Sequence, residues 1–141
     1  MILSQSCEYG IRAVIYIAKN STDDYISIGR ISRDLDISFH FLTKILQKLS
    51  REKILVSSRG PAGGIRLAKQ ENMITVMEII TAIDGKRLFG DCVLGLAECN
   101  DAHPCPFHDT WVEHRKKLAR EFRQINIGDL AEQTRINELR I

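Results

Sequence analysis

The chain has 141 residues, the size of one domain or of a small domain with an appendage. Hydrophobic residues make up 44% and charged residues 27%, which excludes a disordered chain. No apolar run approaches the roughly 18 residues that span a bilayer, so a membrane protein is excluded. The first eight residues lack the basic start and the cleavage site of a secretory signal, so we expect a cytoplasmic protein.

The formal net charge of +2 is unevenly spread along the chain. Residues 1–70 hold 5 Lys and 6 Arg against 4 Asp and 2 Glu, a net charge of +5. Residues 71–141 hold 3 Lys and 6 Arg against 5 Asp and 7 Glu, a net charge of −3. A basic N-terminal half is typical of proteins that meet phosphate groups, although a solvated surface would show the same asymmetry.

Three helices are predicted in the first 52 residues, because apolar residues recur there at steps of three and four. They cover about residues 4–19, 27–35 and 38–52, with a polar turn at 20–24. Ser27 and Ser38 stand at helix starts, where a hydroxyl can cap the first backbone amides. Asp36-Ile37 is predicted to make the tight turn between the second and third helices.

The periodicity changes after the third helix. Residues 54–58 and 65–67 are typical of short strands, and the Gly- and Pro-rich segment 59–64 between them predicts a hairpin. A helix over 75–84, an irregular segment and a long helix over 106–124 follow, with a short helix at the end. The fold class is therefore mainly α with a small β-hairpin wing. We expect a winged helix-turn-helix domain (1–84), a cysteine-rich loop (85–105), and a dimerisation helix with a short C-terminal helix (106–141).

The third helix has a polar face suited to DNA. Its apolar stripe would point into the core, which leaves hydrogen-bonding side chains for base edges and basic ones for phosphates. The predicted DNA-binding residues are Ser38, His40, Thr43, Lys44 and Lys48, with Gln47 and Arg51 on the same face and Arg59 and Gly60 at the hairpin tip. An amphipathic helix whose polar face is only hydrated would show the same pattern of apolar and polar residues. Arg59 on its Gly-rich turn has no evident packing task and suits a narrow minor groove.

Three cysteines crowd together late in the chain. Cys92, Cys99 and Cys105, with His108, supply three thiolates and one imidazole within seventeen residues. Soft sulfur ligands select iron–sulfur clusters, Zn or Cu(I), and a reducing compartment disfavours disulfides. The spacings differ from the Cys-x-x-Cys knuckles of zinc ribbons. Zn and metal-free thiols remain alternatives, and Cys7, alone in an apolar helix, is expected to be a small buried residue.

Residues 57–67, Ser-Ser-Arg-Gly-Pro-Ala-Gly-Gly-Ile-Arg-Leu, resemble the wing signature of the Rrf-two family, which includes IscR, NsrR and CymR. Residues 8–12 and 37–42 also resemble that family's first helix and the start of its recognition helix. The resemblance covers essentially the whole chain. It implies a homodimeric bacterial transcription factor that binds a two-fold symmetric operator in double-stranded DNA. Ser38, His40 and Thr43 would then face bases, and Arg59 would enter the minor groove.

In the resembled family, a three-cysteine loop at this place holds an iron–sulfur cluster. His108 matches the histidine that completes a [2Fe–2S] site in IscR-like members. NsrR-like members instead use an acidic residue of the partner subunit, at the position of Glu8. The resemblance favours [2Fe–2S], and [4Fe–4S] is possible because six residues rather than five separate Cys92 from Cys99. Redox state, nitric oxide or iron and cluster status would be the signal.

The long helix carries an apolar seam that is too narrow for a core helix. Antiparallel pairing with its copy would bury Trp111, Leu118 and Phe122 and create a two-fold axis. Because the cysteine loop directly precedes this helix, loss of a cluster is expected to alter the geometry of the dimer.

An enzyme is not expected, because the sequence has no Cys-x-x-Cys, no Gly-rich nucleotide loop and no recognisable acid–base pair. The alternatives to an iron–sulfur regulator are a zinc-stabilised nucleic-acid-binding protein and a thiol-based winged-helix repressor without a cluster.

Overall fold

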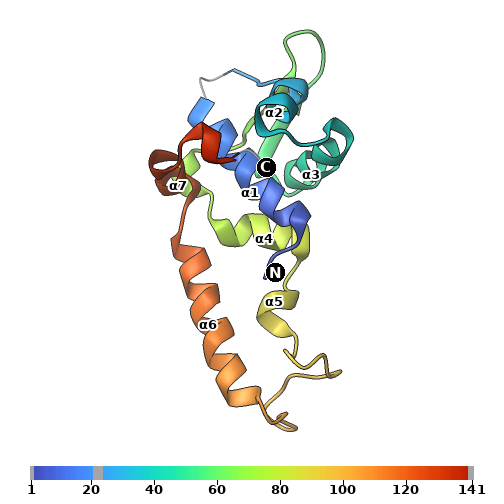
Figure 1. Ribbon diagram of the computed structural model, residues 1–141, viewed down its shortest axis with the longest axis vertical. Helices are drawn as coiled ribbons and strands as arrows, with labels where there is room; N and C mark the ends of the chain where they lie inside the picture. The colour runs from blue at the N-terminus through green and yellow to red at the C-terminus, as the bar shows by residue number, and fades with distance from the viewer. Residues whose placement is uncertain (1, 21–23, 140–141) are drawn as a thin grey trace.

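The computed structural model describes residues 2–20 and 24–139, and residues 21–23 of the predicted polar turn lie outside it. The prediction of a mainly helical fold with one hairpin is confirmed for the described residues (Figure 1). The elements are α1 (Gln5–Asn20), α2 (Ile28–Leu35), α3 (Phe39–Arg51), β1 (Leu55–Ser58), β2 (Gly64–Leu67), η1 (Glu71–Met73), α4 (Val76–Asp84), α5 (Arg87–Gly90), α6 (His108–Gln124), α7 (Ile127–Gln133) and η2 (Ile136–Leu139).

Helix α1 is the centre of the core and packs against α2, α3, α4, α7 and β2. Its buried side includes Val14, Tyr16 and Ile17, and Cys7 is fully buried as predicted. Gly10 lets α4 approach closely, since a Cβ there would lie 2.3 Å from Ile83 Cδ1. A larger residue at position 10 would make the Ile83 side chain shift where α1 meets α4.

The helix-turn-helix unit is α2, the turn at Asp36-Ile37, and α3. Ser27 caps α2 as predicted, because its Oγ accepts from the Arg30 amide at 3.2 Å. Asp36 ends α2 in the left-handed conformation, with φ of 59°. The prediction that the Ser38 side chain caps α3 is wrong, because it makes no capping hydrogen bond. Ser38 is exposed, so its hydroxyl remains available to a ligand.

The hairpin pairs β1 with β2 antiparallel, from Leu55 opposite Leu67 to Ser58 opposite Gly64. An isolated bridge joins Ile65 of β2 to Ile26, just before α2. The wing is thus attached to the segment that leads into the helix-turn-helix unit.

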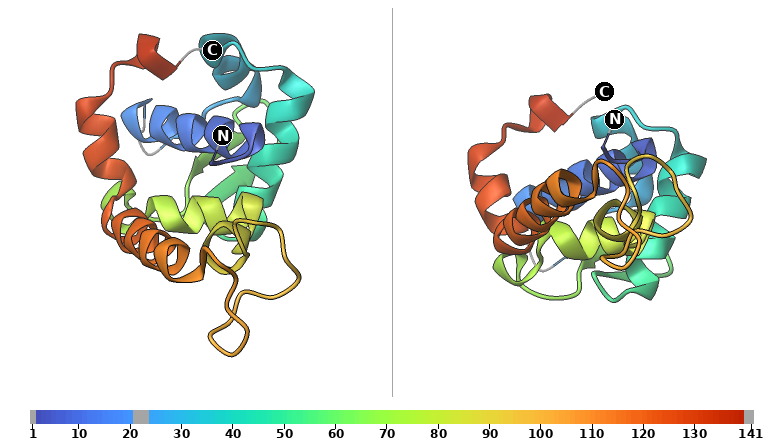
Figure 2. Two further views of the ribbon diagram at one scale, coloured as in Figure 1. Left: turned by 60° about the horizontal axis from the view of Figure 1, so that its bottom comes forward. Right: turned by 90° about the horizontal axis from the view of Figure 1, so that it is seen from below.

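Helix α6 extends from the core and carries the cysteine loop at its free end (Figures 1 and 2). It packs against α4 and α5, and its Phe122 ring meets Phe89 of α5 edge-on with centroids 6.2 Å apart. The sequence predicted irregular structure over 85–105, and α5 is a short helix within it. The hairpin tip and the cysteine loop lie at opposite ends of the long axis (Figure 1). No helix in the described ranges is long and apolar enough to cross a membrane.

Candidate DNA-binding face and cysteine site

The predicted DNA-binding residues lie at the start of α3, along α3 and at the hairpin tip. Only Thr43 is half-buried, whereas the others are exposed: Ser38, His40, Lys44, Lys48, Arg59 and Gly60. A groove of about 440 Å³ separates the two elements, with Thr43 on its helix side and Arg59 on its hairpin side. Gln47, Arg51 and Ser57 also line this groove. Hydrogen-bonding and basic groups therefore surround a concave surface of the kind that faces a nucleic-acid backbone.

The start of α3 presents two features that the sequence did not reveal. Thr43 Oγ1 donates to the Phe39 carbonyl at 2.7 Å, so its oxygen can only accept a further hydrogen bond. The Phe39 ring is 48% exposed and stands edge-on to the His40 ring, with centroids 5.8 Å apart. An exposed apolar ring beside polar side chains can meet a thymine methyl group in a major groove.

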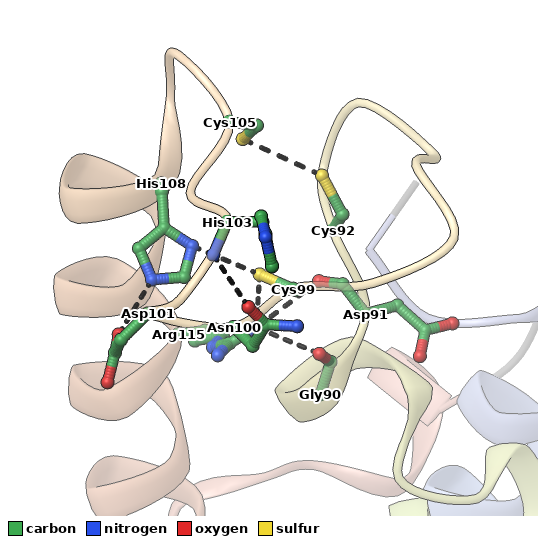
Figure 3. A network of polar contacts seen from close by, with 10 residues as sticks. All are labelled: Gly90, Asp91, Cys92, Cys99, Asn100, Asp101, His103, Cys105, His108 and Arg115. Carbon is green, nitrogen blue, oxygen red and sulfur yellow. Dashed lines mark hydrogen bonds and ion pairs between the residues drawn. The ribbon is translucent and has the colours of Figure 1, made fainter.

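The four predicted metal ligands come together as two pairs near the first turn of α6 (Figure 3). The Sγ atoms of Cys92 and Cys105 are 3.7 Å apart. Cys99 Sγ lies 3.5 Å from His108 Nδ1. All three cysteines are free thiols. The loop therefore folds back so that Cys92 meets Cys105, rather than Cys99, which is nearer in sequence.

His108 is buried, with 4% exposed, whereas no Asp, Glu, Lys or Arg in the described ranges is buried. Its Nε2 lies 2.9 Å from Asp101 Oδ1, which fixes the ring with Nδ1 toward Cys99 (Figure 3). The hydrogen bond to His108 and the charge of the ring hold the pKa of the Asp101 carboxyl below its usual range. Contacts at both ring nitrogens therefore orient the His108 side chain.

The paired thiols Cys92 and Cys105 differ in acidity. Backbone hydrogen bonds, the largest from Leu96, lower the pKa of the Cys92 thiol. Burial raises the pKa of the Cys105 thiol, and the neighbouring Cys92 sulfur adds to that effect. The Cys92 thiol therefore loses its proton more readily than the Cys105 thiol, and the thiolate is the form that binds a metal.

Comparisons with known proteins agree on one family. Residues 3–133 match the family Rrf2, described as iron-dependent transcriptional regulator. The chain belongs to the Rrf2 family. It is 27% identical over 139 residues to the HTH-type transcriptional regulator IscR of Photobacterium profundum, covering 99% of this chain and 80% of that protein.

Two solved structures show the same fold. CymR (YrzC), the global cysteine regulator of B. subtilis, has a TM-score of 0.78 and 22% identity, covering 94% of this chain and 98% of that chain. IscR of T. potens has a TM-score of 0.74 and 21% identity, covering 93% and 86%. This Rrf2-family chain is a DNA-binding transcriptional regulator and not an enzyme, as its sequence predicted.

Two side chains of α6 other than His108 also contact the cysteine loop in this Rrf2-family regulator. Trp111 Nε1 donates to the Asp91 carbonyl at 2.9 Å, so its polar edge bonds within its own chain. Arg115 Nη1 donates to the Gly90 carbonyl at 2.9 Å and to Cys99 Sγ at 3.1 Å. The sequence named neither Asp101 nor Arg115 as part of the site. Arg115 lies seven positions after His108, and this spacing was the available signal that both share one helix face.

Proposed function

We propose that this regulator binds a two-fold symmetric operator as a homodimer and responds to an iron–sulfur cluster of the [2Fe–2S] type. The ligands of the cluster are Cys92, Cys99, Cys105 and His108. When bound, the cluster supplies a centre whose charge and integrity change with redox state, nitric oxide or iron supply.

The single observation that supports this proposal is the pairing of the four side chains. On one tetrahedral metal, two sulfur ligands lie about 3.8 Å apart, and a sulfur and a histidine nitrogen about 3.6 Å apart. The spacings of 3.7 Å for Cys92 and Cys105 and 3.5 Å for Cys99 and His108 match these values. A [2Fe–2S] cluster takes two protein ligands on each iron, so two separate pairs suit it.

The same arrangement disfavours a structural zinc site. Within the described ranges, no three side chains of the metal-ligating types gather around one point. A structural zinc ion takes four converging ligands, so this loop would have to rearrange before it could hold one.

His108 is the better candidate for the fourth ligand. It is buried beside Cys99, and Asp101 engages its other ring nitrogen at 2.9 Å. Metal-bound histidines usually donate that second N–H to a carboxylate or a carbonyl. Glu8 of the partner subunit remains the alternative fourth ligand, and that ligand set would correspond to a [4Fe–4S] cluster.

Apolar residues on α6 support the proposed homodimer. Trp111, Leu118 and Phe122 are each half-buried, so they still present apolar surface after packing within their own chain. Pairing of α6 with its copy gives a two-fold axis. Two copies of α3 can then enter two half-sites about 34 Å apart on one side of the DNA.

The experiment is anaerobic purification of the full chain, followed by an absorbance spectrum with iron and sulfide analysis. We expect a brown protein with two irons and two sulfides per subunit. His108→Ala should hold less iron, whereas His114→Ala, an exposed histidine on the same helix, should match the wild type. Four irons per subunit would favour the Glu8 alternative. A colourless protein with stoichiometric Zn, or one with free thiols after reconstitution, would overturn the proposal.

A further inference from the structure

Cys99 is held from one helix by two side chains. His108 and Arg115 are seven residues apart on α6, two helical turns, and so lie on the same face. His108 Nδ1 is 3.5 Å from Cys99 Sγ, and Arg115 Nη1 is 3.1 Å from it. If His108 is a metal ligand, Arg115 is the second group on α6 that contacts the site.

The Arg115 guanidinium also contacts the start of the cysteine loop. Arg115 Nη1 donates to the carbonyls of Gly90, at 2.9 Å, and Asp91, at 3.4 Å. Residue 91 immediately precedes Cys92. One half-buried side chain therefore joins the entrance of the loop, its middle cysteine and α6 (Figure 3).

We propose that Arg115 is the positioning residue that fastens the cysteine site to α6 and sets the reduction potential of the cluster. A guanidinium donating to a thiolate makes a charge-assisted hydrogen bond, about twice as strong as a neutral one. Hydrogen bonds to the sulfurs of a cluster are among the factors that set its potential. Because the donor is cationic, it stabilises the more negative, reduced state.

Arg115 also bears on signalling. Loss of the cluster removes the iron that would join Cys99 to His108, and the contact of Cys99 with Arg115 then has to hold that cysteine at α6. This contact is one of the links between the cysteine loop and the helix through which we propose the dimer forms. The part of this inference that concerns the potential rests on the proposed function, whereas the fastening of the loop does not.

The test uses the full chain with Arg115→Gln, Arg115→Lys and, as control, Arg120→Gln. Arg120 is an exposed cation on the same helix. Three quantities are measured: the rate of iron loss to a chelator, the midpoint potential, and amide hydrogen exchange of residues 88–101 with and without cluster. Exchange is read by mass spectrometry, and circular dichroism checks the fold of each variant.

We expect Arg115→Gln to lose iron about 10-fold faster, as typical for an outer-shell partner of a metal ligand. Its midpoint potential should become more negative, and residues 88–101 should exchange faster in both forms. Arg115→Lys should restore part of the potential, because it keeps the charge. Wild-type behaviour of Arg115→Gln in all three quantities would overturn the proposal. Wild-type protein that takes up no iron would defeat the proposed function, and the exchange of the metal-free chain would still decide whether Arg115 fastens the loop.

Discussion

Ile26 and Ile65 exchange both of their backbone hydrogen bonds, with N–O distances of 2.9 and 2.8 Å. Ile26 lies outside the named strands, and this bridge ties β2 of the wing to the residue that precedes the Ser27 cap of α2. The hairpin is consequently oriented by the same segment that starts the helix-turn-helix unit. The proposed DNA-binding surface, formed by Arg59 at the hairpin tip and the polar face of α3, therefore depends on this bridge.

Gly64→Ala should loosen that surface. A Cβ at Gly64 would lie 2.2 Å from the Ile26 carbonyl oxygen, so the bridge must open or shift. We expect the free energy of unfolding to fall by about 1–3 kcal/mol. Gly29→Ala is the control, because nothing lies within 4 Å of a Cβ there, in the first turn of α2. It should raise stability by about 0.5–1 kcal/mol. Urea unfolding measures both, and equal stability of the two variants would contradict this account.

Arg59→Ala should weaken DNA binding without changing the fold. Arg59 is exposed at the hairpin tip and lines the groove beside α3. If it contacts the DNA backbone, the slope of log affinity against log salt should decrease by about 1. Lys117→Ala removes an exposed cation on α6, far from the hairpin along the chain, and should leave the slope unchanged. Fluorescence anisotropy over a salt series provides the measurement, and identical slopes for the two variants would count against the proposed face.

The fold could be predicted wherever one apolar stripe dominates a segment. Leu42, Leu46 and Leu49 set the inner face of α3, and Gly and Pro marked the hairpin. Helix α5 escaped detection because four residues are too few to display a period. The error at Ser38 has a different cause. Sequence preference favours serine at a helix start, but it cannot tell whether the hydroxyl turns to the amides or to solvent.

The candidate site was predictable in its residue types and not in its contacts. Spacing placed three cysteines and His108 in one loop, but the pairing of Cys92 with Cys105 depends on how that loop folds back. Nothing in the spacing of the long helix indicates that Arg115 contacts Cys99. Asp101 stands in a polar loop where no spacing rule singles out one carboxylate.

Acid should weaken the start of α4 through Glu78. Burial opposes ionisation of this carboxyl, but hydrogen bonds from Lys69 and Thr75, with the charge of Lys69, outweigh it and hold its pKa below the usual value. Its contribution to stability is therefore complete above the pKa of the unfolded chain and is lost as pH falls through the folded pKa. Glu78→Gln should flatten the loss of stability below about pH 4.5, relative to wild type. Glu121→Gln, at an exposed site, should leave this loss of stability unchanged. Urea denaturation of each variant between about pH 3 and pH 7 measures the free energy of unfolding and tests both expectations.

Cys7 should resist alkylation while the loop cysteines react. Burial, with the negative charges of Asp84 and Glu8, raises the pKa of the Cys7 thiol to about 12. Thiolate is the reactive form, so almost none is present at pH 8. In cluster-free protein, iodoacetamide followed by mass spectrometry should label Cys92, Cys99 and Cys105 first. Early labelling of Cys7 in folded protein would show that α1 opens at its N-terminal end.

Asp101→Asn should impair retention of the proposed cluster, although Asp101 is not among its proposed ligands. Its Oδ1 lies 2.9 Å from His108 Nε2 and orients the buried ring toward Cys99. An amide can present its NH2 group instead of an acceptor, which leaves the ring free to turn and lowers its basicity. Loss of such a partner typically reduces metal affinity about 10- to 100-fold. Asp109→Asn changes an exposed carboxylate in the first turn of α6 and serves as control. Iron release to a chelator compares the two, and equal rates would mean that the Asp101 contact does not support the fourth ligand.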